Sequence, residues 1–188
     1  MLSELVLKNR SYRSFNNARK VTREELVALV SLARVTPSAA NRQPLKYRLV
    51  TADEMGKLLP CTKWAAALPQ MHFPPEGHEP TAAIAVCHDT AIFENPQSSA
   101  VDRGIVGQTM LLGAAELGLG GIMIENFRAD AVREALALPE NLVPALVIAF
   151  GEPDEKIVLE DAADSTKYYR DAENVHHVPK RKLEDLIV

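Results

Sequence analysis

The clearest periodicity in the chain follows Thr22, where apolar side chains recur at the spacing of one helical face. Thr22 and Glu25 form the T-x-x-E pattern of a capping box, which marks the start of a helix. The apolar positions that follow are Leu26, Leu29, Val30 and Ala33. Together these features predict a helix over residues 23–35.

Two stretches with the patterns of strands come next. Residues 46–51, KYRLVT, alternate polar and apolar side chains and predict a strand. Residues 81–87, TAAIAVC, are a continuous apolar run, which predicts a strand that is buried on both faces. The segment 60–80 between them is rich in loop-forming residues, and we expect at most one short helix there, at 62–68.

The second half of the chain alternates helix and strand patterns. Residues 100–121, AVDRGIVGQTMLLGAAELGLGG, predict a long buried helix that ends in glycines. A strand (GIMIENF, 121–127), a helix (RADAVREAL, 128–136) and a strand with a turn (PALVIAFGEP, 144–153) are expected after it.

Beyond Gly151 the sequence becomes charged and has few apolar residues, but its last residues are apolar again. These are Leu183, Leu186, Ile187 and Val188. Since nothing follows them that they could cover, we expect the tail to dock on another surface, such as a partner subunit.

Composition narrows the class of protein. With 188 residues, 47% hydrophobic and 24% charged, one soluble globular domain is the default. A net charge of −4 gives no broad basic field, so we expect no nucleic-acid partner. Two cysteines imply no disulfide framework, the N-terminus is too polar for a secretory signal, and no run approaches the roughly 20 apolar residues of a membrane helix. We therefore expect a cytoplasmic protein, without a membrane partner, that acts on small molecules.

The common catalytic and metal-binding motifs are missing from the sequence. It contains no G-x-S-x-G, no G-x-x-x-x-G-K-[ST] and no H-E-x-x-H. In CHD (87–89), strand alternation places His88 on the opposite face from Cys87 and Asp89, so we interpret this as the polar end of a buried strand. His176 and His177 are adjacent, which is a poor spacing for two ligands of one metal. We expect no metal.

Basic side chains gather near both ends of the chain. NRSYRSF (9–15) places Arg10 and Arg13 on either side of Ser11, and PKRK (179–182) adds three cations. Without a glycine-rich loop, a phosphorylated cofactor would have to be held by such cations, and arginine suits bidentate binding. Taken alone, both stretches also fit a solvated turn or a charged terminus, and the pattern by itself favours that interpretation.

Several segments together resemble a known family. RSYRSF (10–15) resembles the R-S-x-R-x-F signature of the FMN-dependent nitroreductase family, and TPSAANRQP (36–44) resembles its P-S-x-x-N-x-Q-P loop. ELGLGGIMIENF (116–127) and LPENLVPALVIAFGEP (138–153) resemble its glycine-ended central helix and its late strand closing in G-x-P. The match runs in order through nearly the whole chain.

The resemblance implies an α+β fold with a central, mainly antiparallel sheet flanked by helices, built as an intertwined homodimer with FMN at the subunit interface. Residues 1–188 would form a single FMN-binding domain, in which 152–188 is a tail exchanged between subunits that packs on the partner. Such an exchange would explain why the end of the tail is apolar.

It also implies roles for the cations. Arg10 and Ser11 would bind the phosphate end of FMN, and Arg13 would lie near the N1–O2 edge of the ring. Reduced flavin carries negative charge at N1, so a cation there favours the hydride-loaded state. Lys180 and Arg181 would complete the phosphate site, although the spacing does not show which of 180–182 point inward.

The loop at 36–44 would reach the flavin that is bound mainly by the other subunit. By resemblance, Ser38 and Asn41 make this contact. The pyrimidine edge of the flavin alternates donors and acceptors, and the amides of Asn41 and Gln43 offer both. Pro37 and Pro44 would keep the loop stiff, which limits the entropy lost on binding.

The segment that contains Gly121, Ile122 and Glu125 would pass near N5 of the ring and offer backbone N–H groups. Glu125 fits a surface carboxylate at the end of a strand equally well. Some relatives have P-I-E-G-F here, and this chain departs from that pattern at Met123 and Asn126.

The resemblance finally implies an activity, that of an FMN-dependent NAD(P)H oxidoreductase. NADH or NADPH would deliver hydride to flavin N5, and a nitroaromatic, quinone or similar electron-poor acceptor would then be reduced in ping-pong order. No side chain is expected to act as a nucleophile. Two alternatives stay open: a flavin-dependent oxidase on the same fold, and a flavin-binding or partner-binding protein without turnover.

Overall fold

The computed structural model of the protein describes residues 1–66 and 68–188. Its helices are α1 (Leu2–Lys8), α2 (Arg23–Ala33), α3 (Ala52–Leu58), α4 (Ala100–Glu116) and α5 (Ala129–Ala135). Its strands are β1 (Phe15–Asn16), β2 (Leu45–Val50), β3 (Ala82–Asp89), β4 (Gly120–Ile124), β5 (Leu142–Pro153), β6 (Ile157–Asp161), β7 (Tyr169–Arg170) and β8 (His176–Lys180). Short 3₁₀ turns are η1 (Ala39–Asn41), η2 (Leu59–Cys61), η3 (Pro96–Ser99) and η4 (Leu183–Asp185).

The main sheet is antiparallel and is organised around β5. This strand pairs with β3 on one side, and β3 in turn pairs with β2. β5 also pairs with β4 and, near its C-terminal end, with β1, where Phe15 lies opposite Pro153. The expected α+β fold with an antiparallel sheet and helices is thereby confirmed.

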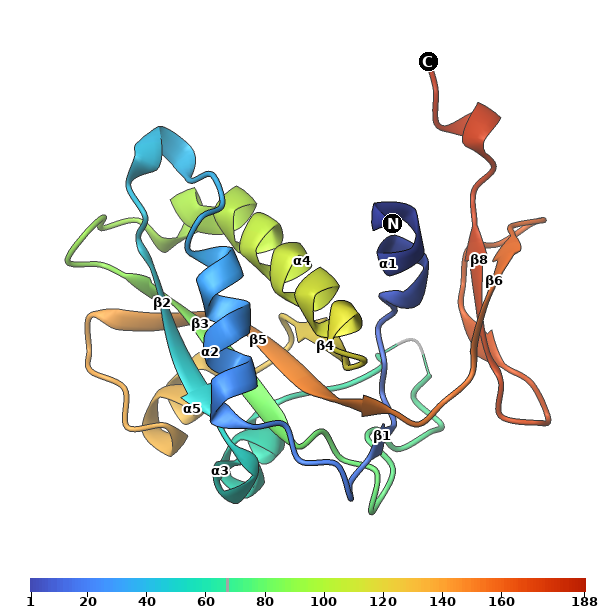
Figure 1. The fold of residues 1–188 in the computed structure, drawn as a ribbon, viewed down its shortest axis with the longest axis horizontal. Helices are drawn as coiled ribbons and strands as arrows, with labels where there is room; N and C mark the ends of the chain where they lie inside the picture. The colour runs from blue at the N-terminus through green and yellow to red at the C-terminus, as the bar shows by residue number, and fades with distance from the viewer. Residues whose placement is uncertain (67) are drawn as a thin grey trace.

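Helices cover both faces of this sheet, because side chains on β5 alternate between two cores (Figure 1). Leu146, Ile148 and Phe150 face α2 and α4. Val147 and Ala149 face α3 and α5. Apolar side chains on opposite faces of one strand therefore hold the two helical layers together.

The strand expected at 81–87 is β3, and it lies at the centre of the sheet. All eight of its residues are buried, as the continuous apolar run predicts. The expected alternation at its polar end is also confirmed. Cys87 packs in the core on the α3 and α5 side, and the Nδ1 atom of His88 lies 2.9 Å from the Ser99 hydroxyl oxygen. Burial raises the pKa of the Cys87 thiol to about 11, so this cysteine is a poor nucleophile.

The expected helix at 23–35 corresponds to α2, and its capping box is present. The Glu25 N–H donates to the Thr22 hydroxyl (3.2 Å), and the Thr22 N–H donates to the Glu25 carboxylate (2.8 Å). The expected helix at 100–121 is too long, because α4 ends at Glu116. Gly118 adopts a φ of +75°, which turns the chain, and Gly120 and Gly121 already belong to β4.

The short helix considered at 62–68 does not form in the described residues 62–66 and 68. Thr62 forms an isolated bridge with Phe127, and the Lys63 N–H donates to the Asn126 carbonyl (2.8 Å). Ala65 has a φ of +45°, outside the helical region. Pairing with a distant segment therefore replaces local helical hydrogen bonds.

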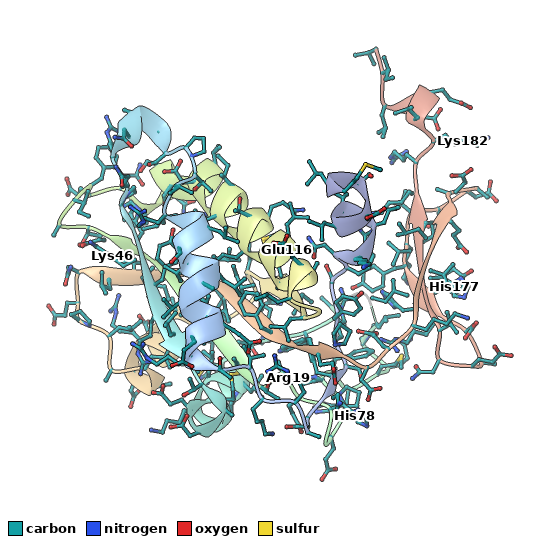
Figure 2. All side chains as sticks on the ribbon, viewed as in Figure 1. Arg19, Lys46, His78, Glu116, His177 and Lys182 are labelled. Atoms are coloured by element: carbon teal, nitrogen blue, oxygen red, sulfur yellow. The ribbon has the colours of Figure 1, made fainter. Side chains whose placement is uncertain are left out.

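The tail forms a second, three-stranded sheet that the sequence patterns do not predict. β8 pairs with β6 in parallel and with β7 in the antiparallel sense. This tail sheet stands beside α1 and away from the main sheet (Figure 1). The imidazole of His177 (Figure 2) joins two carboxylates within it, with Nδ1 3.0 Å from Glu160 and Nε2 3.2 Å from Asp171.

Apolar side chains stay exposed on α1 and at the end of the tail. Helix α1 has no buried residue. Exposed apolar residues in these two segments are Met1, Leu2, Val6, Leu7, Leu183, Leu186, Ile187 and Val188. Among residues 1–66 and 68–188, none of the helices has the length and apolar character needed to cross a membrane.

Two glycine substitutions test the packing of the main sheet. A Cβ atom at Gly151 would lie 2.7 Å from Cδ1 of the fully buried Phe15, so Gly151→Ala should lower the free energy of unfolding by about 1–3 kcal/mol. Gly56 in α3 has no atom within 4 Å of the corresponding position. Gly56→Ala should therefore raise the free energy of unfolding by about 0.5–1 kcal/mol. Chemical denaturation measures both, and a stabilised Gly151→Ala protein would contradict this packing.

The tail sheet should depend on pH through His177. Its hydrogen bonds to Glu160 and Asp171 raise the pKa of His177 above the ordinary value. The stabilisation of the folded protein by protonated His177 is therefore complete below pH about 6.5, and it is lost as the pH rises through the raised pKa of His177 in the folded state. Wild type should exceed His177→Gln in thermal stability at pH about 6, and the gap should narrow by pH about 9. A gap that widens with pH would contradict the ion pairs.

Candidate cofactor site

A hollow of about 310 Å³ separates the N-terminal segment from the tail sheet. Its lining residues come from the segment after α1, from α4, β4 and β6, and from the tail: Asn9, Arg10, Ser11, Arg13, Gln108, Leu111, Met123, Ile157, Tyr168, His176, Val178 and Lys180. Three of these side chains are cations, and none of the described residues that line the hollow carries a carboxylate. This set of side chains favours an anionic ligand that also has an apolar part.

Contact with β4 positions the N-terminal side of the hollow. Ser11 forms a parallel bridge with Gly121, and the Tyr12 N–H donates to the Gly121 carbonyl (3.1 Å). A Cβ atom at Gly121 would lie 2.5 Å from the Ala149 carbonyl oxygen of β5, and one at Gly120 would collide with the Tyr12 ring, so these glycines let β4 pack closely against β5 and the N-terminal segment. Arg10, next to Ser11, donates from Nη2 to the Val6 carbonyl at the end of α1 (2.6 Å).

Arg13 is almost completely buried and is held from several sides. Its Nη1 donates to the Ser11 carbonyl (2.9 Å), and its guanidinium carbon lies 5.1 Å from the centre of the Tyr168 ring. Burial lowers the pKa of Arg13, but the guanidinium of an arginine stays charged at neutral pH. Arg13 therefore places a fixed positive charge in the wall of the hollow.

A buried carboxylate joins this segment to the tail. Glu155 accepts hydrogen bonds from the backbone N–H groups of Arg13 and Ser14 and from the guanidinium of Arg170. The side chains of Arg170 and Glu155 are only 4% and 2% exposed. A buried ion pair is stable only when hydrogen bonds offset its desolvation, and here the backbone of Arg13 and Ser14 supplies them. Glu155 therefore holds Arg170 of the tail against the segment that contains Arg13.

His176 completes the inner wall of the hollow. Its Nε2 atom lies 3.4 Å from Nη1 of Arg13, and its ring centre lies 5.2 Å from that of Tyr168. Burial, together with the positive charges of Arg13 and Arg170, lowers the pKa of His176 to about 4. The imidazole is therefore neutral at physiological pH.

Alternation along β8 decides which tail side chains face the hollow. His176, Val178 and Lys180 line it, at every second position. Arg181 lines a separate hollow with residues 162–166 and Asp185. The structure thus brings Lys180, and not Arg181, together with Arg10, Ser11 and Arg13.

Ser38, Asn41 and Gln43 lie in a loop at the other end of the molecule. The Ser38 hydroxyl donates to Oδ2 of the buried Asp102 (2.6 Å), and the Ala39 N–H donates to Oδ1 (3.2 Å). The Gln43 N–H donates to the Ser38 hydroxyl (3.0 Å), and its side-chain amide donates to the Asn41 side-chain oxygen (2.9 Å). These bonds make the loop rigid.

The backbone of this loop is also strained. Three residues without glycine's freedom, Ala40, Asn41 and Gln43, have φ values of 50°, 53° and 51°. Such conformations persist only where surrounding contacts enforce them, and they gather at binding sites. Asp102, in the first turn of α4, supplies that enforcement.

Within one chain the two groups of predicted site residues stay apart. The loop at η1 lies beyond the N-terminal end of α4, whereas α1 and β8 lie on the opposite side of the molecule (Figure 1). Lys46, just after the loop, and Lys182, just after β8, mark this separation (Figure 2). The loop residues Ser38 and Gln43 line a different hollow, of about 180 Å³.

The remaining predicted residues follow β4. Gly121 contacts Ser11, as described above. Ile122 is buried in the core on the α3 and α5 side, and Glu125 is exposed beyond the end of the strand. The sequence patterns did not point to His176 or Tyr168 as part of the site. Counting back from Lys180 by twos would have indicated His176, but only if β8 had been recognised as a strand.

Comparisons with known proteins agree with this fold. A model of the nitroreductase family matches residues 6–152. A protein of Archaeoglobus fulgidus with the provisional name NADH dehydrogenase/NAD(P)H nitroreductase is 31% identical over 160 residues, covering 81% of this chain and 86% of its own. A Bacillus subtilis protein named FMN reductase (NADPH) is 27% identical over 164 residues, covering 80% of this chain and 65% of its own.

A solved structure agrees as well. The crystal structure of a nitroreductase family protein from Clostridium difficile 630 superposes with a TM-score of 0.63 at 29% identity, covering 82% of this chain and 85% of that one. The family match covers far more than half of the chain, in the same order as the motifs. The chain therefore belongs to the nitroreductase family, and it is an oxidoreductase of that family.

Proposed function

We propose that this chain is an FMN-dependent NAD(P)H oxidoreductase that works as a cytoplasmic homodimer of single-domain subunits. One observation carries the proposal: Arg10, Arg13 and Lys180 come from opposite ends of the chain and meet in one hollow whose described lining has no carboxylate. The names of the relatives from Archaeoglobus fulgidus and Bacillus subtilis, which include NAD(P)H and FMN, support the choice of cofactor and reductant.

The residues of the hollow fit FMN. Arg10, Ser11 and Lys180 offer charged and hydroxyl donors for a phosphate, and Leu111 and Met123 offer apolar surface for a ring. Arg13 is held rigidly by Ser11 and Tyr168, so its charge costs little reorganisation when negative charge develops at the N1–O2 edge.

When bound, FMN supplies atom N5, through which hydride passes from NADH or NADPH to a nitroaromatic, quinone or similar electron-poor acceptor in ping-pong order. The protein binds, orients and tunes the charge of the ring, and no side chain forms a covalent bond. We place the backbone of Gly121, Ile122 and Glu125 near N5, because Met123 of the same segment lines the hollow. In the single chain Arg181 lines a separate hollow with Asp185, so Lys180 is the tail cation that the geometry favours for the phosphate.

We infer that a second subunit completes each site. The rigid loop with Ser38, Asn41 and Gln43 lies beyond the N-terminal end of α4, away from α1 and β8, which border the hollow of its own chain (Figure 1). Ser38 keeps one free lone pair after its bonds to Asp102 and Gln43, so it can accept one more hydrogen bond. The exposed apolar residues of α1 and of the tail (152–188) supply a surface that a partner can cover.

Arg13 provides the first test. Arg13→Ala should weaken FMN binding about 10- to 100-fold, because a hydrogen bond to a charged group contributes about 1.5–3 kcal/mol. It should also slow flavin reduction by NADPH. Arg13→Lys keeps a positive charge in the wall of the hollow, so its FMN affinity and reduction rate should lie between those of wild type and Arg13→Ala. Arg23→Ala, at an exposed position of α2, is the matched control. Fluorescence titration of the apoprotein with FMN measures the affinities.

Thermal unfolding shows whether each Arg13 variant is folded. A folded Arg13→Ala protein that binds FMN as tightly as wild type, and is reduced as fast, would exclude the role assigned to Arg13.

Mixed dimers test whether the site is shared. Arg10→Ala damages the hollow, and Asn41→Asp removes an amide donor from the loop while keeping a residue type that tolerates positive φ. If each site uses Arg10 of one subunit and Asn41 of the other, a mixed dimer has one intact site and one doubly damaged site. Random mixing in equal amounts should then restore roughly a quarter of the wild-type FMN sites.

If both residues served the site of their own chain, every site in the mixed dimer would carry one damaged residue. Mixing would then restore nothing beyond the average of the two variants, and this outcome would refute a shared site.

A further inference from the structure

His176 holds a hydrogen-bonding atom that the described part of the chain leaves without a partner. Its side chain is 1% exposed, and it lines the hollow between Arg13 and Lys180. Nε2 lies 3.4 Å from Arg13, but Nδ1 is buried and has no hydrogen-bond partner. Arginine Nε atoms are left unpaired at several places in this structure, whereas His176 is the one imidazole among the described residues with such an atom.

The contact with Arg13 determines which imidazole nitrogen carries the proton. A guanidinium can only donate hydrogen bonds, so Nε2 must accept. In a neutral imidazole the proton then sits on Nδ1, which becomes a donor. The positive charges of Arg13 and Arg170 and the deep burial keep the ring neutral. His176 therefore presents an uncharged N–H group that has no acceptor bonded to it among residues 1–66 and 68–188.

None of the described residues accepts a hydrogen bond from this N–H group. Glu155, the buried carboxylate that joins the tail to Arg13, already accepts from Arg13, Ser14 and Arg170. Side-chain oxygens of Asn9, Ser11, Gln108 and Tyr168 also line the hollow, but none of them is bonded to Nδ1. Because a buried donor without an acceptor is costly, its persistence in the wall of a cavity points to a ligand atom.

We propose that His176 is a further cofactor-binding residue, which donates from Nδ1–H to an acceptor on the same N1–O2 edge of the flavin that Arg13 faces. The inference rests on the proposed function. His176 is assigned to the ring edge because it contacts Arg13 directly. It is not assigned to the phosphate because Lys180 lies four residues further along β8, about 13 Å away along an extended strand. A neutral donor binds the edge in both redox states, more strongly in the anionic reduced state, and Arg13 adds the charge.

Two substitutions separate the two nitrogens of His176. Asparagine places its amide nitrogen near the position of Nδ1, so His176→Asn keeps the donor and loses the partner of Arg13. Glutamine reaches the position of Nε2, so His176→Gln keeps the partner of Arg13 and loses the donor. His177→Gln is the matched control, because His177 contacts Glu160 and Asp171 on the other side of the strand.

His176→Gln should bind both FMN and riboflavin about 10-fold more weakly than wild type, and the midpoint potential of its bound FMN should fall. His176→Asn should stay close to wild type in both measurements, and so should His177→Gln. Riboflavin lacks the phosphate, so an equal loss for the two ligands locates the hydrogen bond at the ring. The apoproteins are titrated by fluorescence, and the midpoint potential is measured separately, without turnover.

Three outcomes would overturn the inference while leaving the proposed function intact: His176→Gln binding FMN like wild type, both variants losing affinity equally, or a loss confined to FMN. A merely structural role would lower the thermal stability of His176→Gln and His176→Asn together without moving the potential of the loaded protein. Wild-type protein that takes up no FMN would instead overturn the proposed function and this inference with it.

Discussion

The close approach of the N-terminal segment to Gly121 is the constraint on which the hollow depends. Ser11 bridges Gly121, and the Tyr12 N–H donates to its carbonyl. A methyl group at the neighbouring Gly120 would collide with the Tyr12 ring and push this segment away from β4. Because the segment lies so close to the sheet, the residues on either side of it, Arg10 and Arg13, face the tail rather than solvent. Glycine at position 120 thus lets this segment lie where Arg10 and Arg13 line the hollow.

Charge burial then couples this segment to the tail. Glu155 follows β5 directly and accepts hydrogen bonds from the backbone of Arg13 and Ser14 and from Arg170 on β7. Removing one partner of such a buried pair costs about 3–5 kcal/mol, because the other charge stays buried and uncompensated. The tail sheet is therefore held against the hollow by polar contacts, whereas the main sheet is held by its two apolar cores.

The sequence predicts what depends on local periodicity. The capping box at Thr22 and the apolar run of β3 each specify an element by themselves, and both are found. The helix predicted at 100–121 is longer than α4, because the apolar pattern continues past the turn at Gly118 into β4. The family motifs indicated Arg10, Ser11 and Arg13, which do line one hollow.

What the sequence could not show depends on contacts between distant segments. The short strands of the tail have little apolar pattern, since a buried ion pair and the His177 carboxylates stabilise them. The sequence therefore could not show that strand alternation along β8 brings His176 and Lys180 to one hollow and Arg181 to another. The internal hydrogen bonds of the loop at Ser38 depend on Asp102, which no spacing rule connects to it.

We propose that cations from both ends of the chain hold a flavin that NAD(P)H reduces. The most direct measurement is the visible absorbance of the purified wild-type protein, loaded with FMN and freed of excess, before and after anaerobic addition of NADPH or NADH. We expect a retained flavin band that bleaches promptly with at least one of the two reductants. Protein that stays colourless after incubation with FMN, or a bound flavin that neither reductant bleaches, would contradict it.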